Sequence, residues 1–447
     1  MVEPVIISRA QHTISRRDID PDALKVLYRL QQSKFDAYLV GGGVRDLLLG
    51  RRPKDFDIAT NAHPYQIKKL FRNCWIIGRR FRLAHVKFGQ KTIEVATFRR
   101  NVPDPLPDEE VDDAPAVVAS SPDPRDGAAR REDDGIIRRD NTFGTPEEDA
   151  FRRDFTVNAL AYDIATYSII DYVGGLADLE QRVIRSIGDP KVRFVEDPVR
   201  MLRAAVFSSR LGFSIDPLVL EAITELRHLI GQAAAPRLLE EYYKILRSGY
   251  AEASFRTLDS LGLLELMTPE LCAPAGGPSD DVWDSLARLD AYRRRFDAPP
   301  PELTNAILMG ALLVPAGLIE KRGTGASADT RVNFGKLPIA RRDLDRLGQI
   351  VSLVPRMLEP DPPPRLTRSL PQRPAFRDAL LWLEIFTDAP DELAAWEAMR
   401  AMAPVPTEQG GGRDGARETG APGTGRRKRR RRGRRRGGRG KAPAPTE

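Results

Sequence analysis

The 447-residue chain has few cysteines, few histidines and few aromatic residues. Its two cysteines, Cys74 and Cys272, cannot provide the disulfide framework of a small secreted domain. The four histidines are too scattered to form a metal-ligand set, and no His-Asp pair of the phosphohydrolase kind is present. They are His12, His63, His85 and His228. We interpret His85, which lies in an apolar strand pattern, as a structural residue.

The sequence also lacks a long hydrophobic run. No stretch approaches the ~18–20 apolar residues of a membrane span. The first residues, Met-Val-Glu-Pro-Val-Ile-Ile-Ser, lack the basic-then-apolar order of a signal peptide. The length suffices for two or three domains with a sizeable core. We therefore expect a multidomain protein of the reducing cytoplasm with no membrane partner.

Positive charge is concentrated near the C-terminal end. The net charge is +7, but residues 403–447 hold 14 Lys and Arg against four acids, so this tail carries +10 and the rest −3. The tail is rich in Gly, Pro and Arg without periodicity, which predicts disorder. We expect it to capture RNA phosphates with little sequence choice, an incidental tail or an anionic membrane being the weaker alternatives. The residues assigned to RNA binding are Arg426, Arg427, Lys428, Arg429, Arg430, Arg431, Arg432, Arg434, Arg435 and Arg436.

A second biased segment is acidic. Residues 101–135 contain six prolines and 11 acids but only three basic residues, a composition that cannot bury enough apolar area to fold. We predict a disordered insertion within a folded domain. It is a solvated loop without a role, a negative surface that repels nucleic acid from the wrong face, or a competitor of RNA for the basic tail.

A glycine-rich turn follows the first predicted strand of this domain, Tyr38–Val40. The missing Cβ atoms of Gly41, Gly42 and Gly43 would let backbone amides approach a phosphate. A short helix is predicted next, with Arg45 near its N-terminal end and a stop at residue 50. Taken alone, the turn is more often a plain strand-turn-helix connection, and it matches neither the dinucleotide-binding nor the P-loop pattern.

Two acids follow that helix. In Asp55-Phe56-Asp57, the two-residue period of a strand places both carboxylates on one face. Taken alone, such a pair is more often a solvated strand end. Next to the glycine turn it becomes more specific, because two carboxylates can hold the metal ions that stabilise attacking and leaving oxygens in phosphoryl transfer.

Four sequence blocks stand in order along the chain: Leu-Val-Gly-Gly-Gly-Val-Arg-Asp (39–46), Lys-Asp-Phe-Asp (54–57), Arg-Arg-Asp-Phe-Thr-Val-Asn-Ala-Leu (152–160) and Glu-Asp-Pro-Val-Arg-Met-Leu-Arg-Ala (196–204). Together they resemble the class II nucleotidyltransferases, the family of bacterial poly(A) polymerases and tRNA CCA-adding enzymes. The resemblance covers about residues 35–250. Residues 76–86 are similar to the poly(A) polymerase branch.

The resemblance implies an α/β (α+β) nucleotidyltransferase head with a small mixed sheet, then an all-α neck and body and the disordered basic tail. We place an N-terminal segment at 1–34, the head at 35–175, the neck at 176–250, the body at 251–403 and the tail at 404–447. Apolar periodicity predicts helices over 22–32, 218–229, 237–246, 254–264, 282–295, 303–313, 342–353 and 375–385.

The resemblance also implies roles for the acids. Asp55 and Asp57 would hold two Mg²⁺ ions, and Asp154 would complete the acidic site. From the residues alone, Asp154 could equally cap a helix that we predict over 155–164. Glu94 lies in the second strand of a predicted hairpin, 81–88 with 91–98. It is either a further acid near the metals or the partner of a basic neighbour.

The nucleotide site is assigned in the same way. The backbone of Gly42 and Gly43, with Arg45 and Arg153, would cradle phosphates. Asp197 caps a predicted helix that ends near residue 212, and residues three apart on a helix share a face. This face carries Asp197, Arg200 and Arg203, which is either a salt-bridged surface or, as the resemblance implies, the contact for the incoming base. Val206 stands where the family usually has arginine, and Arg210, one turn further on, is the candidate replacement.

The expected activity is template-independent addition of AMP from ATP to RNA 3′ ends, with release of pyrophosphate. RNA 3′ ends and ATP are thus the expected partners, and RNA-decay proteins are a candidate class. A CCA-adding enzyme is the nearer alternative, since it shares all four blocks. An RNA-binding protein with an inactive nucleotidyltransferase fold is the other, although the retained acids Asp55, Asp57 and Asp154 argue against it.

Overall fold

The computed structural model describes residues 3–78, 82–100, 143–272, 277–319, 332–360 and 362–402. Residues Met1–Ala401 form one unit of the structure and Met402–Glu447 a second. The predicted acidic insertion and the RNA-binding tail lie outside the described residues. No helix in the described ranges is both long enough and apolar enough to cross a membrane.

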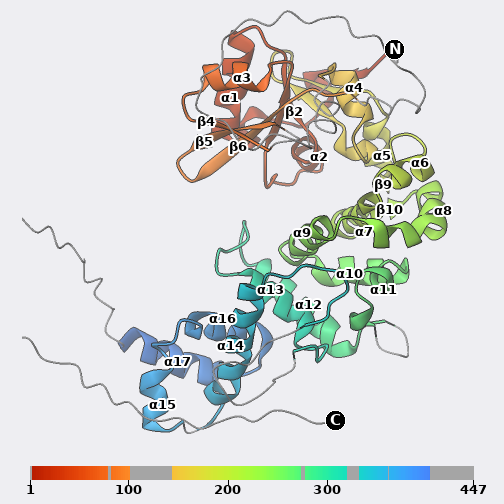
Figure 1. The fold of residues 1–447 in the computed structure, drawn as a ribbon. Coiled ribbons are helices and arrows are strands. Elements are labelled where there is room, and N and C mark those ends of the chain that lie inside the picture. The colour runs from red at the N-terminus through yellow and green to blue at the C-terminus, as the bar shows by residue number, and fades with distance from the viewer. Residues whose placement is uncertain are drawn as a thin grey trace, which may run out of the picture. The chain divides into compact units, whose positions relative to one another are not determined.

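An eight-stranded mixed sheet forms the N-terminal part of the chain (Figure 1). Its strand order is β1-β8-β7-β2-β3-β6-β5-β4, and β3 with β6 is its parallel pair. The strands are β1 Val5–Ile7, β2 Ala37–Val40, β3 Asp57–Thr60, β4 Cys74–Ile77, β5 Leu83–Phe88, β6 Lys91–Thr97, β7 Ala161–Asp163 and β8 Ser168–Asp171. The predicted mixed sheet is confirmed, as is the β5–β6 hairpin with its two-residue turn at Gly89.

Among the described residues, the helices that accompany the sheet are α1 Pro21–Gln32, α2 Gly42–Leu48, α3 Pro64–Leu70, α4 Pro146–Phe151 and α5 Gly175–Gln181. Helices α1 and α3 lie side by side (Figure 1). Asp20 caps α1 by accepting from the amides of the first turn, and α1 buries Ala23, Val26, Leu27 and Leu30. The predicted helix over 22–32 is therefore confirmed, because its cap and its apolar period agree.

The helix predicted over 155–164 is wrong. Residues Thr156–Asn158 form a single 3₁₀ turn, and strand β7 follows between β2 and β8. The aromatic and β-branched residues Phe155, Val157 and Tyr162, all buried, favour such an extended segment over a helix. Asp154 consequently caps no α-helix, and its role must be judged from its contacts.

Helices make up most of the chain after the sheet. They are α6 Pro190–Glu196, α7 Val199–Leu211, α8 Pro217–Leu226, α9 Ala235–Leu246, α10 Ala251–Ser260, α11 Leu264–Met267, α12 Asp280–Arg293, α13 Asn305–Leu313, α14 Arg341–Met357, α15 Pro364–Ser369, α16 Phe376–Phe386 and α17 Pro390–Met402. A two-stranded parallel ribbon, β9 Val183–Ile184 with β10 Ser214–Ile215, lies beside α7. The helices predicted from apolar periodicity are confirmed, with shifts of a few residues at their ends.

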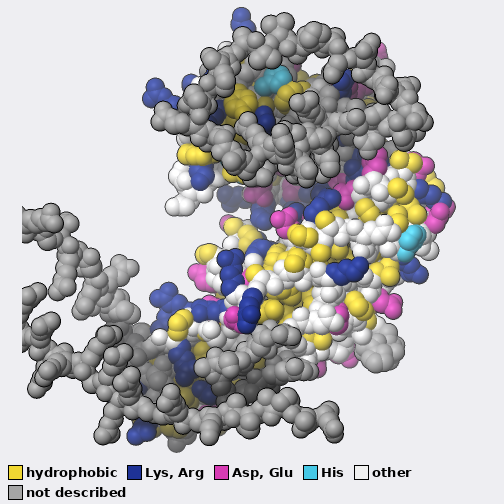
Figure 2. Space-filling model, in the orientation of Figure 1, with side chains coloured by type: hydrophobic (Ala, Val, Ile, Leu, Met, Phe, Trp, Pro, Cys, Tyr) yellow, Lys and Arg dark blue, Asp and Glu magenta, His cyan; other side chains and the backbone are white. Residues whose placement is uncertain are grey.

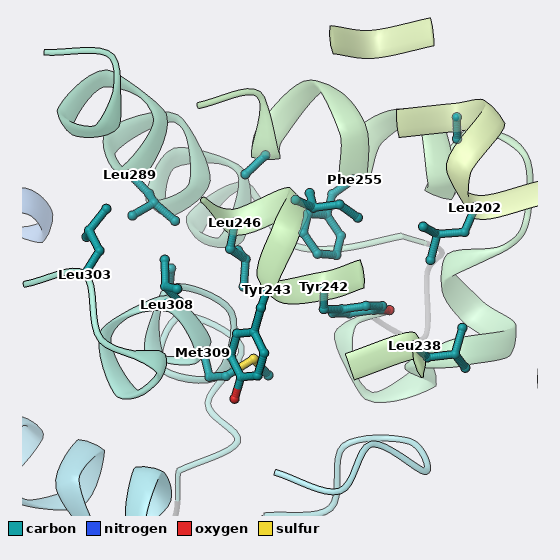
Figure 3. Packing of buried hydrophobic residues seen from close by; sticks show 14 of the residues in the cluster. Leu202, Leu238, Tyr242, Tyr243, Leu246, Phe255, Leu289, Leu303, Leu308 and Met309 are labelled. Carbon is teal, nitrogen blue, oxygen red and sulfur yellow. The ribbon is translucent and has the colours of Figure 1, made fainter. Parts of the chain in front are cut away.

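Their hydrophobic faces form one continuous core (Figure 3). Leu202 of α7, Leu238 of α9, Phe255 of α10, Leu289 of α12 and Leu308 of α13 belong to it and are fully or almost fully buried. The helices that follow the sheet are thus joined by apolar packing.

On the face drawn in Figure 2, acidic and basic side chains are intermixed with hydrophobic ones over α7 to α11.

Candidate active site

Three acidic side chains gather where β3 begins. In the parallel pairing of β3 and β6, Ile58 lies opposite Val95, which places Asp57 beside Glu94. The sequence predicted one strand that carries both aspartates. Strand β3 begins only at Asp57, and Asp55 lies before it. The two carboxylates nevertheless lie close enough for Asp55 to act on the pKa of Asp57.

Glu94 has a basic neighbour and also lies close to Asp57. It faces His85 across the β5–β6 hairpin, with 3.6 Å between Glu94 Oε1 and His85 Nε2. It also acts on Asp57. Loss of hydration raises the pKa of Asp57 to about 6, and the negative charges of Glu94 and Asp55 add to that shift. The Asp57 side chain still reaches solvent, so a ligand can approach it.

This carboxylate group suits a divalent cation. Loss of hydration is the main cause of the raised pKa of Asp57, and a cation bound between Asp55 and Asp57 would offset the part that the neighbouring carboxylates add. Within the described ranges, no three His, Cys, Asp or Glu side chains are arranged to hold a metal by themselves. Mg²⁺ at nucleotide sites needs no such set, because it binds one or two carboxylates together with substrate phosphates and water.

Asp154 lies among arginines instead. Its Oδ2 is 2.5 Å from Arg203 Nη2 of α7, and its Oδ1 accepts from the amide of Phe155 at 2.8 Å. Burial lowers the pKa of Arg203, but Asp154 and Glu241 outweigh it, so the net shift is upward. The structure therefore brings Asp154 together with the predicted base-contact residue Arg203.

The glycines of the turn allow close packing against the Asp55 segment and Arg153. Gly41 has a φ of +74° and precedes α2, while Gly42 and Gly43 lie in the first turn of that helix. A Cβ on Gly43 would lie 3.3 Å from the carbonyl oxygen of Asp55, and one on Gly41 would lie 3.1 Å from Arg153 Nη1. The absent Cβ atoms thus let α2 approach the Asp55 segment and leave room for Arg153.

Arg45 is a buried structural residue in this fold. Its side chain is 2% exposed, and its guanidinium donates to Asp46 Oδ1 at 2.6 Å and to the amide oxygen of Asn158. Burial lowers the pKa of Arg45, although the Asp46 carboxylate opposes that shift. Because its donors are engaged, we leave Arg45 out of the phosphate ligands proposed below.

Arg153 is better placed for a phosphate. It donates to Asp149 Oδ2 at 3.1 Å and to the carbonyl oxygen of Asn158 at 3.3 Å, and 22% of its side chain stays exposed. Its positive charge lowers the pKa of Asp57, against the larger upward effects. Arg153 thus lies within electrostatic reach of the acidic group.

The predicted base-contact residues have separate partners. Asp197 follows the last residue of α6 and receives two hydrogen bonds from Arg237 of α9, at 3.1 and 2.8 Å. Arg200, in the first turn of α7, donates to Glu196 at 3.0 Å. The helix starts at Val199 and ends before Gly212, whose φ is +72°. It therefore begins later than predicted and ends as predicted.

Helix α7 also contacts the glycine segment. Val206 packs against the core, and Arg210 Nη2 lies 3.4 Å from Asp46 Oδ2 of α2. Arg210 therefore pairs with the aspartate that already holds Arg45. In this fold it joins two helices through that one contact, and 35% of its side chain stays exposed.

Two arginines that support the site were missed from the sequence. Arg193 of α6, 6% exposed, donates to the carbonyl oxygens of Arg152 and Arg153 at 2.7 and 2.6 Å and so fixes the segment before Asp154. Arg237 fixes Asp197. The signal for Arg237 is its place in Pro-Arg-Leu-Leu-Glu-Glu, a stretch similar to the family's neck, whereas nothing local marks Arg193.

Comparison with known families agrees with this geometry. Residues 37–185 match the "Poly A polymerase head domain", and residues 212–273 match the "Probable RNA and SrmB- binding site of polymerase A". The first match contains Asp55, Asp57, Glu94 and Asp154. The second begins directly after α7.

Curated relatives fall into two groups. Poly(A) polymerase I of Escherichia coli O6:H1 is 48% identical over 266 residues, which are 60% of this chain and 54% of that protein. The CCA-adding enzyme of Bacillus velezensis is 30% identical over 337 residues, 75% of this chain and 73% of that protein. The chain thus spans about half the length of the poly(A) polymerases it matches.

A solved structure shares the fold. The CCA-adding enzyme of Bacillus stearothermophilus in complex with CTP has a TM-score of 0.56 and 29% identity, with coverage of 86% of this chain and 82% of that one. Sequence and fold thus agree along most of the described chain. This chain belongs to the class II nucleotidyltransferases, the family of bacterial poly(A) polymerases and tRNA CCA-adding enzymes.

Proposed function

We propose that this protein transfers AMP from ATP to the 3′ ends of RNA and releases pyrophosphate. The observation that carries the proposal is the group of Asp55, Asp57 and Glu94 at the start of β3, in a segment 48% identical to poly(A) polymerase I. Carboxylates that repel one another at a solvent-reachable strand end favour a metal-nucleotide complex as their ligand.

Each group has a defined task in this reaction. Asp55 and Asp57 would hold Mg²⁺, which supplies charge stabilisation at the phosphoryl oxygens when bound. Arg153 would offset the negative charge of the triphosphate. The 3′ oxygen of the RNA attacks the α-phosphate, a new phosphodiester bond forms, and pyrophosphate leaves. Glu94 adds negative charge that favours cation binding at Asp57.

Asp154 would act next to this group, held in place by Arg203. Its ion pair with α7 ties the acid to the helix that carries the base-contact residues. ATP bound here would therefore have its triphosphate and its base at neighbouring groups. That the backbone amides of Gly42 and Gly43 contact phosphate remains a prediction.

Adenine selection is assigned to Asp197 and Arg200. A carboxylate and a guanidinium offer an acceptor and donors to a base edge, as a template base would. Arg237 orients Asp197 through two hydrogen bonds, and Glu196 orients Arg200. Both contact residues are thus held by a neighbour before a nucleotide arrives, which lowers the entropic cost of binding.

A CCA-adding activity is the second candidate, because the match to the B. velezensis enzyme covers 73% of that protein. The two activities share the acidic group and differ in product. Capture of RNA by the basic tail, a role for RNA-decay proteins and a cytoplasmic location stay predictions.

The test is incubation of the purified protein with Mg²⁺ and each nucleotide separately, on an unstructured RNA and on tRNA lacking its CCA end. We expect repeated A addition to the unstructured RNA and little C addition, resolved on a sequencing gel. Exclusive use of the tRNA, with a product that ends in one CCA, would establish the second candidate instead. No incorporation on either RNA would refute both.

A further inference from the structure

An exposed tryptophan shares the sheet face of the acidic group. Strand register places Trp75 opposite His85, His85 opposite Glu94, and Glu94 beside Asp57. Residues directly opposite one another point to the same side of a sheet. Trp75 therefore stands three strands from Asp57 on the same face, about 14 Å away at the usual spacing of ~4.7–4.9 Å per strand.

Trp75 differs from the other tryptophans of the chain. It is 51% exposed, whereas Trp283, Trp382 and Trp396 are 7%, 6% and 2% exposed. Its strand, β4, is the last strand of the sheet. Cys74 packs into the core from the opposite face of β4, so the strand is anchored on one side and presents Trp75 on the other. Its ring is therefore accessible to a flat ligand that can stack on it.

One basic side chain lies over this ring, and the surrounding sequence is rich in Lys and Arg. Lys87 of β5 lies with its Nζ 5.2 Å from the centroid of the Trp75 ring, and Arg82 lies 5.9 Å from the ring centroid of Tyr65. Residues 51–100 contain 13 Lys and Arg against three acids, a net charge of +10. The three acids are Asp55, Asp57 and Glu94, the acidic group itself. Outside that group the segment is positive, which complements a phosphate backbone.

We propose that Trp75 and Lys87 form a platform for the RNA primer, in which the indole stacks on a base and the ammonium binds a neighbouring phosphate. Aromatic rings interleaved with cations are how proteins bind single-stranded nucleic acid without sequence choice. The distance between the platform and the acidic group is one that a short extended stretch of RNA can span. A primer with its 3′ end at Asp57 would therefore cross it. The proposal rests on the proposed function in taking RNA as the primer.

An edge strand can also pair with another protein chain. Strand β4 is only Cys74–Ile77, and the neighbouring Lys87 disfavours such pairing by its charge. The same charge favours RNA. A protein partner is thus an outcome that the test must recognise.

The first experiment uses intrinsic fluorescence of the full chain with a short oligoadenylate and no nucleotide. We expect RNA to quench the emission of the wild-type protein, because Trp75 alone among the four tryptophans is widely exposed. Trp75→Phe should abolish the quenching and retain the affinity within about twofold, since phenylalanine also stacks. Quenching that persists in Trp75→Phe would overturn the proposal.

The second experiment measures affinity by anisotropy of labelled RNA over a range of salt. Trp75→Ala should weaken binding by about tenfold or more at every salt concentration. Lys87→Gln should lower the log–log salt slope by about 0.7, the value for one phosphate contact on a single strand. The matched control is Phe296→Ala, which removes a ring that is 41% exposed after α12 and should change neither quantity.

The outcomes also separate this inference from the proposed function. Binding is measured without ATP, so an inactive protein that still shows the Trp75 signals would refute AMP transfer and support the platform. An active protein whose Trp75→Ala variant keeps wild-type RNA affinity would support AMP transfer and refute the platform. Wild-type affinity with an altered oligomeric state, measured by light scattering, would assign Trp75 to a protein interface and overturn the platform.

Discussion

The smallest scale at which the site can be tested is a single carboxylate. We expect Asp55→Ala or Asp57→Ala to lower kcat for AMP transfer by about a thousandfold or more, because metal-based charge stabilisation supplies several kcal/mol. Both residues are exposed, so far-UV circular dichroism and the unfolding midpoint should stay unchanged. The control is Glu180→Gln, an exposed acid on α5. Near-normal incorporation by either alanine variant would refute the metal assignment.

Asp171 illustrates a residue that supports the fold. Its carboxylate, 2% exposed, accepts from the amides of Val173, Gly174, Gly175 and Leu176 at 2.9–3.0 Å and so caps α5. We expect Asp171→Ala to lower the free energy of unfolding by about 3 kcal/mol, because buried amides lose a charged acceptor. Urea unfolding measures this loss. Asp171→Asn keeps one acceptor oxygen and should lose less; an equal loss would mean that charge alone matters.

At this scale the sequence indicated which residues were candidates for the site, but it did not indicate which side chains they contact. Short motifs marked Asp55, Asp57 and Asp154 as candidates, and the fold places Asp55 close to Asp57. The sequence assigned Arg45 to phosphate, whereas the fold buries that guanidinium against Asp46 and Asn158. The distance along the chain from Arg45 to Asn158 shows why, since no local pattern records which side chains a fold brings together.

At the scale of elements, helix α2 and the Asp55 segment form one packed unit. Gly43→Ala should push the Asp55 carbonyl away by a few tenths of an ångström, because the new Cβ would start 3.3 Å from it. We expect kcat to fall by about tenfold while stability changes by less than ~1 kcal/mol, since catalytic geometry is the more sensitive quantity. Gly231→Ala, which meets no atom within 4 Å, is the control. Equal activity of the two variants would contradict this coupling.

Elements with strong local signals were predicted well. Helix α1 has a capping aspartate and an apolar period, and helix α7 ends at a left-handed glycine, so both follow from nearby residues. Residues 155–164 carry a mixed signal. Their state is decided by pairing of β7 with β2, a strand more than 100 residues earlier in the chain, which apolar periodicity does not record.

At the scale of the whole molecule, positive charge occurs in two places. The tail carries +10 and residues 51–100 carry +10, so acids elsewhere offset most of the total. Truncation after Val405 should lower the log–log salt slope of RNA binding by roughly three if five tail contacts are lost, at about 0.7 each. AMP transfer at saturating primer should persist. The slope is read from binding isotherms, and an unchanged slope would exclude the tail from RNA capture.

The residual slope of the truncated protein is equally informative. The basic residues of 51–100 remain in the truncated protein. We therefore expect some phosphate contacts to persist and the log–log salt slope of RNA binding to differ clearly from zero. The full-length protein carrying Lys87→Gln provides the matched comparison. A slope of zero after truncation would place all phosphate contacts in the tail.

The contacts of α6 and α7 have a consequence for how this protein can be recombined with its relatives. Arg203 holds Asp154, Arg210 holds Asp46, and Arg193 holds two carbonyl oxygens before Asp154. A chimera joined at residue 185 would inherit the aspartates from one parent and their arginines from the other. Such a hybrid gene should yield active protein only if the donor supplies matching arginines, so exchangeable modules in this molecule extend through residue 211.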